Sequence, residues 1–131
     1  MHHTPPGVQV RQSARNVKET IDRLQAFLQQ HGVTIYARID QQAEVARAGQ
    51  HIGPLEFLMF GNPKAGGPVM AENPLAALDL PLKVIAWEDA QGQTWFAYNE
   101  EPYIRERFSL HPEITGPLNL DGVIGKALAG Q

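Results

Sequence analysis

Residues 82–98, LKVIAWEDAQGQTWFAY, predict a β-hairpin and thereby the kind of sheet that this chain forms. Two runs rich in β-branched and aromatic residues, Leu82–Glu88 and Gln93–Tyr98, flank the turn residues Asp89-Ala90-Gln91-Gly92. Strands joined by so short a turn must be antiparallel, because a parallel crossover needs a dozen or more residues. We therefore expect an antiparallel sheet.

An amphipathic helix is predicted near the start of the chain. Asn16 is a suitable N-cap, and Glu19 stands three residues later, as a capping box requires. His31 suits the last helical turn, and Gly32 suits the left-handed position that ends a helix. The apolar side chains at helical spacing form one stripe that can face a sheet: Val17, Ile21, Leu24 and Leu28.

Three further segments have strand character. Val8–Gln12 alternates apolar and polar residues, and Leu55–Phe60 is an apolar run that contains Glu56. Val33–Asp40 also alternates, which predicts one apolar and one polar face. The apolar face would carry Val33, Ile35, Ala37 and Ile39, and the polar face Thr34, Tyr36, Arg38 and Asp40.

The remaining segments predict turns and short helices. Lys64–Gly67 is interpreted as a flexible turn, with Pro68 at the first position of a helix that ends at Asn73-Pro74. Short helices are expected over 42–48, 75–78 and 101–108, and Asp121 is expected to cap a last one. The order β-α-β-β-α-β-β-α predicts an α+β fold, with an antiparallel-dominated sheet of four to five strands and helices packed mainly on one face.

Length and composition restrict the class of protein. A chain of 131 residues with 43% apolar residues fits one domain, which we place at 7–131 after a flexible tail at 1–6. The absence of cysteine removes thiolate chemistry and fits a cytoplasmic location. A net charge of −3 argues against nucleic-acid binding, and no apolar run approaches the length of a membrane span or a signal peptide.

Several stretches resemble the bacterial domain-of-unknown-function family 302. They are Ile39-Asp40, Phe60-Gly61-Asn62-Pro63-Lys64, Leu78-Asp79-Leu80-Pro81-Leu82-Lys83, Trp87-Glu88-Asp89 with Gly92, and Tyr98-Asn99. The resemblance implies a small cytoplasmic α+β protein, often dimeric, with no established activity. The family commonly has a histidine where this chain has Gln41, and often a threonine at Gly67.

Familiar catalytic and metal-binding motifs are not recognisable. Ser13 and Ser109 lie outside any nucleophile elbow, and Gly61–Gly67 departs from a phosphate-binding loop because Gly67-Pro68 follow where lysine and serine or threonine are needed. A strand-to-helix turn is the favoured interpretation of that segment. The histidines lack the spacing of known ligand sets, so no metal and no cofactor is expected.

Three carboxylates and a group of aromatic residues leave alternatives open. Asp40, Glu56 and Glu88 are candidates for acid–base chemistry in an enzyme, provided that two of them share a pocket without a cationic partner. The aromatic residues on predicted strands favour a core and a homodimer interface over a ligand pocket. They are Tyr36, Trp87, Trp95, Phe96 and Tyr98.

The leading hypothesis is a homodimeric module that binds a small molecule or a partner protein. The family-like polar residues fall at predicted strand ends and turns, which carry function more often than packing. The candidate binding residues are Arg38, Asp40, Asn62, Lys64, Glu88 and Tyr98. The site is expected at the polar sheet face and the Asn62 turn, and the alternative is the carboxylate enzyme.

Overall fold

The computed structural model describes residues 3–129, so positions 1–2 of the predicted tail lie outside the described residues. Five strands form one antiparallel sheet in the order β1-β5-β4-β3-β2. They are β1 (Val8–Ser13), β2 (Thr34–Asp40), β3 (Leu55–Gly61), β4 (Leu82–Glu88) and β5 (Thr94–Asn99). The predicted α+β class and antiparallel sheet are confirmed.

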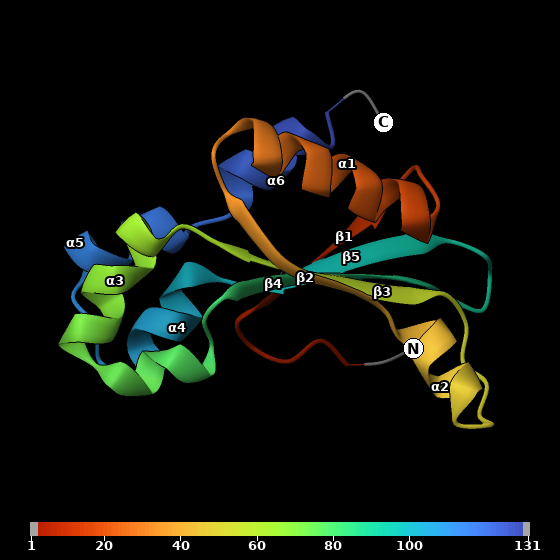
Figure 1. The fold of residues 1–131 in the computed structure, drawn as a ribbon, viewed down its shortest axis with the longest axis horizontal. Helices are drawn as coiled ribbons and strands as arrows, with labels where there is room; N and C mark the ends of the chain where they lie inside the picture. The colour runs from red at the N-terminus through yellow and green to blue at the C-terminus, as the bar shows by residue number, and fades with distance from the viewer. Residues whose placement is uncertain (1–2, 130–131) are drawn as a thin grey trace.

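The helices lie on one face and beyond both ends of the sheet (Figure 1). α1 (Val17–Gln30) and α6 (Asp121–Ala127) cover one face, and α2 (Gln41–Arg47) lies beyond one end. Beyond the other end lie α3 (Pro63–Glu72), α4 (Glu101–Arg107) and α5 (Pro112–Thr115). Two 3₁₀ turns, η1 (Pro74–Leu78) and η2 (Gly116–Leu118), follow α3 and α5.

Local signals explain why α1 and the hairpin form where they were predicted. The Asn16 side chain accepts a hydrogen bond of 2.8 Å from the Glu19 amide, and Gly32 has φ +75° just beyond the helix. In the hairpin, Asp89 accepts from the amides of Gln91 and Gln93 at 3.0 and 2.9 Å. Both elements are therefore fixed by contacts within a few residues of sequence.

The main core lies between α1, α6 and the covered face of the sheet. The α1 stripe packs against inward side chains of the central strands, which are almost fully buried: Leu58, Phe60, Val84, Ala86, Phe96 and Tyr98. Helices α3 to α6 add Val69, Ile104, Thr115 and Ile124 to the buried interior. Burial of these side chains is the main stabilising contribution.

A β-bulge corrects the predicted pattern of β2. The pairing with β3 shifts between Ile35 and Ala37, so that Ile35 lies on the helix-covered face while Ala37 and Ile39 lie on the opposite one. Arg38 is directed toward α1, where it bonds to Asp22. The predicted strict alternation is wrong because a bulge inserts one residue and reverses the side chains beyond it.

The sheet face directed away from α1 is apolar rather than polar. Strand pairing places Trp87 beside Trp95 and Phe57 beside Ile85 on this face. The ammonium group of Lys83 lies 4.7 Å from the ring centroid of Phe57. Further apolar members of this open face are Val10, Ala37, Ile39, Met59 and Ala97.

Two helix starts also differ from the sequence-based expectation. α3 begins at Pro63, capped by Asn62, so the predicted flexible turn is helical and Pro68 lies inside the helix. Pro63 provides the fixed φ that suits the first helical position, which is why the helix starts early. Asp121 is the first residue of α6 and does not cap it, because its carboxylate accepts from the Tyr98 hydroxyl.

Candidate functional site

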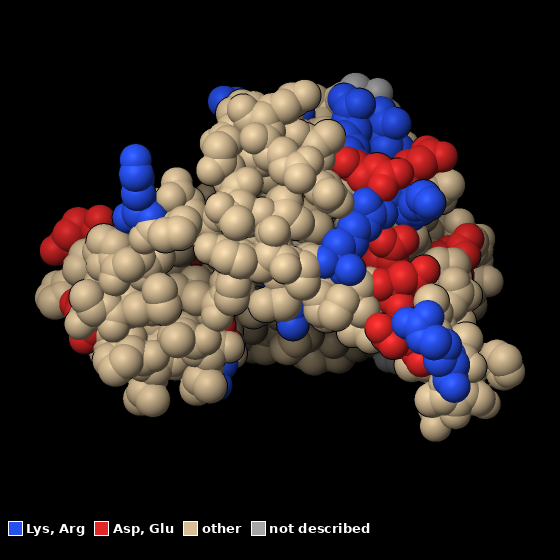
Figure 2. Space-filling model, in the orientation of Figure 1, with Lys and Arg blue, Asp and Glu red and all other residues tan. Residues whose placement is uncertain are grey.

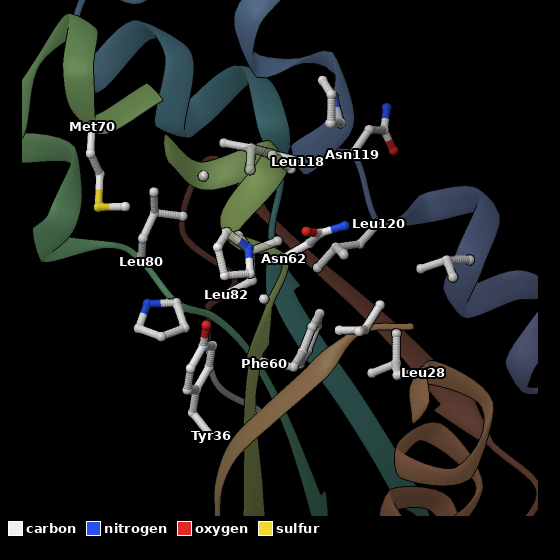
Figure 3. Close-up of a pocket in the computed structure, with 18 residues that line it drawn as sticks. Leu28, Tyr36, Phe60, Asn62, Met70, Leu80, Leu82, Leu118, Asn119 and Leu120 are labelled. Atoms are coloured by element: carbon white, nitrogen blue, oxygen red, sulfur yellow. The ribbon is translucent and has the colours of Figure 1, made fainter. Parts of the chain in front are cut away.

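A cavity of about 340 Å³ lies where the sheet meets the helices beyond its end (Figure 3). Its walls come from the C-terminus of α1, the bulged part of β2, the β3–α3 junction and the segment before β4. Residues 117–120, between α5 and α6, and Val123 of α6 complete the wall, all within the segment 117–123. Segments far apart in the sequence therefore build this site together.

The inner part of the cavity is apolar. Phe60, on β3, is 2% exposed and Leu82, at the start of β4, is 8% exposed. Leu28, Leu118 and Leu120 are equally buried and line the same space. These five side chains, which we call the floor, give a ligand an apolar surface that water occupies poorly.

The polar groups of the cavity lie at its exposed side, which we call the mouth. They belong to Tyr36, Asn62 and Asn119, all of them exposed, with Tyr36 at 50%. Figure 3 shows the Asn62 amide between Tyr36 and Asn119, with the hydroxyl end of Tyr36 directed toward Leu80 and Leu82. The cavity is thus apolar at its buried floor and polar at its exposed mouth.

The two mouth asparagines are oriented by the backbone that follows them. Oδ1 of Asn62 accepts a hydrogen bond of 3.0 Å from the Lys64 amide, and Oδ1 of Asn119 accepts one of 2.9 Å from the Asp121 amide. Among the hydrogen bonds of residues 3–129, neither Nδ2 atom has a partner. Each mouth asparagine can therefore donate to a ligand.

Two glycines keep the cavity open. A Cβ atom at Gly61 would stand 3.4 Å from Cε2 of Tyr36, and one at Gly66 would stand 3.7 Å from Cε of Met70. Gly66 lines the cavity, whereas its neighbour Gly67 does not and has open space around it. A side chain at position 66 would thus extend into the site without displacing backbone.

The start of α3 does not have the features of a phosphate-binding loop. The amides of Ala65 and Gly66 bond to the Asn62 carbonyl at 2.8 and 2.9 Å, and the Lys64 amide bonds to the Asn62 side chain. Pro63 has no N–H to offer. β3 is thus followed directly by the capped start of α3, with no phosphate-binding loop between them.

Of the residues predicted for binding, only Asn62 lines this cavity, although Lys64 follows two residues later. Arg38 pairs with Asp22 and Glu56 at the α1–sheet contact, and Tyr98 lies in the core. Burial, followed by the hydrogen bond to Asp121, raises the pKa of Tyr98 above its ordinary value. The structure thus does not bring the six predicted residues together.

Asp40 and Glu56 lie opposite each other across β2 and β3, but each is engaged by a different partner. Glu56 accepts from Nε of Arg38 at 2.9 Å, and Asp40 caps α2 by accepting from the Ala43 amide at 3.0 Å. Glu88 is exposed at the end of β4. A second cavity, of about 320 Å³, is lined by Asp40 but by neither of the other two.

Sequence reasoning did not assign Tyr36 and Asn119 to a ligand site. Tyr36 was placed on the predicted polar face and among the aromatic strand residues but not among the binding residues, and its place at the mouth depends on the bulge in β2. Asn119 lies between two short helical turns and carries no motif. Within residues 3–129, no group of three or more histidine, aspartate or glutamate residues is arranged to hold a metal ion.

A family comparison places this arrangement among known proteins. The family described as "Domain of unknown function DUF302" matches residues 8–116, most of the chain. The chain is a member of the DUF302 family. The resemblance inferred from the sequence motifs is thereby confirmed, and the DUF302 match includes the floor residues Phe60 and Leu82 but ends before residues 117–123.

Similar proteins support the fold of this DUF302 member. A crystal structure of an uncharacterized conserved DUF302 protein from Bacillus stearothermophilus has a TM-score of 0.78 at 20% identity. That match covers 95% of this chain and 97% of the other. At such low identity it establishes a shared fold and nothing about a ligand.

Curated relatives of this DUF302 chain are considerably longer. The Fluoride-specific ion channel FluC 1 of Brucella suis biovar 1 is 33% identical over 117 residues, covering 84% of this chain and 46% of that protein. FluC 2 of Brucella melitensis biotype 1 gives the same identity and covers 43% of its length. The chain thus spans less than half of these relatives, and no helix of residues 3–129 is long and apolar enough to cross a membrane.

Proposed function

We propose that this DUF302 protein is a cytoplasmic small-molecule binding module that works as a homodimer. The cavity between α1, β3 and α3 carries the proposal, because it combines an apolar floor with a few donors at its mouth. Its volume of about 340 Å³ lies within the range of small-molecule sites. A purely structural protein would leave this cavity without a use.

The binding half is tested with the neutral fluorescent probe N-phenyl-1-naphthylamine. We expect saturable 1:1 binding, strongly weakened in Gly66→Leu because the new side chain occupies the cavity. Gly67→Leu, one residue along the same helix and outside the cavity, is the matched control and should bind as the wild type does. Equal binding by both variants would contradict the assignment of the site.

The dimer half is supported by the open face of the sheet. Five strands about 4.8 Å apart make this face about 20 Å wide, and Phe57, Ile85, Trp87 and Trp95 lie on it. Contiguous apolar surface of this kind marks an interaction site, and aromatic residues are enriched at interface cores. A second copy presents the same apolar surface and is the simplest partner.

Light scattering of the purified protein at micromolar concentration tests the dimer. We expect twice the mass of the chain for the wild type and a monomer for Trp87→Glu, which would place a charge on the open face. Leu78→Glu is the control, because Leu78 is 72% exposed in η1, away from that face, and its variant should stay dimeric. A monomeric wild-type protein would contradict the proposed dimer without affecting the proposed small-molecule binding.

Enzymatic or ion-conducting roles receive less support from the geometry. Two unpaired carboxylates in one pocket would favour the acid–base enzyme, but Glu56 is paired with Arg38 and Asp40 caps a helix. The name of the Brucella relatives, fluoride-specific ion channel, belongs to proteins of which this chain matches less than half. We therefore propose binding and not ion movement for this chain.

A further inference from the structure

The cavity separates apolar from polar surface along its depth. Its buried end is formed by Phe60, Leu82 and Leu118, while Tyr36, Asn62 and Asn119 stand at the exposed end. A molecule that is apolar throughout would cover the donors at the mouth without bonding to them. A molecule that is polar throughout would lose its hydration against the floor without gaining hydrogen bonds there. The site therefore fits a molecule with two unlike ends.

Charge is missing from this site. Among the described residues that line the cavity, none is an aspartate, glutamate, histidine, lysine or arginine. Figure 2 shows charged side chains of both signs gathered over α1 and α2, and a surface almost free of charge between α1 and α3. An ionised head group at the mouth would lose hydration without gaining a partner among the lining residues.

The backbone donors next to the mouth are also engaged. The first amides of α3 bond to Asn62, so the helix start offers no set of free N–H groups for an anion. What remains are the amide nitrogens of Asn62 and Asn119 and the hydroxyl of Tyr36. Such donors can bond an uncharged oxygen acceptor, whereas an anionic head would find no cation among the lining residues to offset its lost hydration.

We propose that the ligand is an uncharged amphiphile, a class that rests on the binding function proposed above. Its apolar body packs on the floor, and a neutral oxygen head, a hydroxyl or a carbonyl, accepts hydrogen bonds at the mouth. Asn119 then has a particular role, because residues 117–123 lie beyond the family match that ends at residue 116. Together with Tyr36 and Asn62, this wall sets which head group the site accepts.

Lys64 is the residue that could reverse the preference for an uncharged head group. It follows Asn62 by two positions on α3, is exposed and does not line the cavity, but its long flexible side chain could reach a head group at the mouth. An anionic head paired with Lys64 would make the ligand a carboxylate rather than an alcohol or ester. The experiment must therefore compare two ligands that share the same apolar chain and differ only in the charge of the head group.

Displacement of N-phenyl-1-naphthylamine by 1-decanol and by decanoate at pH 8 makes that comparison. We expect decanol to displace the probe at a concentration at least tenfold lower than decanoate. Tyr36→Phe and Asn119→Ala should each weaken decanol about fivefold, the effect of one lost hydrogen bond, with little effect on the probe. Lys64→Gln should change neither competitor.

The possible outcomes separate the two proposals. Displacement by decanoate at equal or lower concentration, abolished in Lys64→Gln, would overturn the uncharged class while the binding function stands. Equal decanol affinity in the wild type, Tyr36→Phe and Asn119→Ala would overturn the role of the mouth. Absence of any saturable probe binding to the wild type would remove the binding function itself, and the ligand class with it.

Discussion

Nε of Arg38 donates a hydrogen bond of 2.9 Å to Oε1 of Glu56, across the neighbouring strands β2 and β3. Nη1 of the same guanidinium donates to Asp22 of α1 at 2.6 Å, so one side chain links the outer strand to both its neighbour and the covering helix. The Glu56 side chain is only 12% exposed. This link holds β2 in the place from which its bulge presents Tyr36 to the cavity.

Replacing Arg38 by methionine should destabilise the protein by about 2 kcal/mol. The loss is large for one ion pair because Glu56 would stay buried without its cationic partner. The free energy of unfolding in urea measures the effect. The control is Arg47→Met, which breaks the exposed pair with Glu44 and should cost less than about 0.5 kcal/mol. Equal losses in both variants would contradict the bridging role of Arg38.

The stability of the α3–α5 contact should depend on pH. The hydrogen bond and charge of Glu72, with a further contribution from Glu113, raise the pKa of His111 above its ordinary value of 6.5. A raised folded-state pKa stabilises the fold below pH 6.5, and this contribution is lost as the pH rises through the raised pKa. Wild type should therefore exceed Glu72→Gln in stability at acidic pH, and the gap should narrow as the pH rises.

Urea midpoints of the two proteins across this pH range, with NMR titration of His111, measure the effect. The free energy involved is small, because this histidine is exposed to solvent. A gap between wild type and Glu72→Gln that stays constant with pH would contradict the assignment.

Glycine substitutions should have opposite effects in α6 and in the hairpin turn. Gly125→Ala should stabilise by about 0.5 to 1 kcal/mol, because Gly125 is helical and a Cβ atom there meets nothing within 4 Å. Gly92→Ala should destabilise by about 1 kcal/mol, since Gly92 has φ +79°. Urea unfolding measures both, and stabilisation by Gly92→Ala would be inconsistent with the turn.

We propose that residues 7–131 unfold as a single cooperative unit. One buried cluster combines α1, the sheet, α3 and α6, and Nε of Arg23 donates to the Ala127 carbonyl at 2.8 Å, which joins α1 to the C-terminal helix. Far-ultraviolet circular dichroism, which follows the helices, and fluorescence of Trp87 and Trp95, which follows the sheet, should give coincident transitions. Loss of the helical signal at a lower urea concentration than the tryptophan signal would indicate two independently unfolding units. Removal of residues 1–6 should leave the midpoint unchanged.

Elements specified by local chemistry were predictable from the sequence. Asn16 with Glu19 and Gly32 fixed both ends of α1, and the turn at Asp89 fixed the hairpin. Their partners lie within a few residues along the chain, so spacing alone reveals them. The family motifs also located the Asn62 turn, which does border the cavity.

Features decided by tertiary contacts were not predictable from local patterns. The bulge next to Tyr36 exists because β2 must pair with β3 on one side and bond to α1 through Arg38 on the other. Asp121 had the pattern of a cap, but the Tyr98 hydroxyl, 23 residues earlier, engages its carboxylate. The cavity itself combines five separate segments, and no spacing in the sequence indicates that they come together.

The order of the strands limits how far this sheet can grow. β1 and β2 are the outer strands, and each leaves one row of backbone groups unpaired, which is the usual template for fibre formation. Joining β1 of one molecule to β2 of the next would repeat without end, but the bulge in β2 breaks the straight edge that such an addition requires. The irregularity that presents Tyr36 thereby also protects the protein against polymerisation at high concentration.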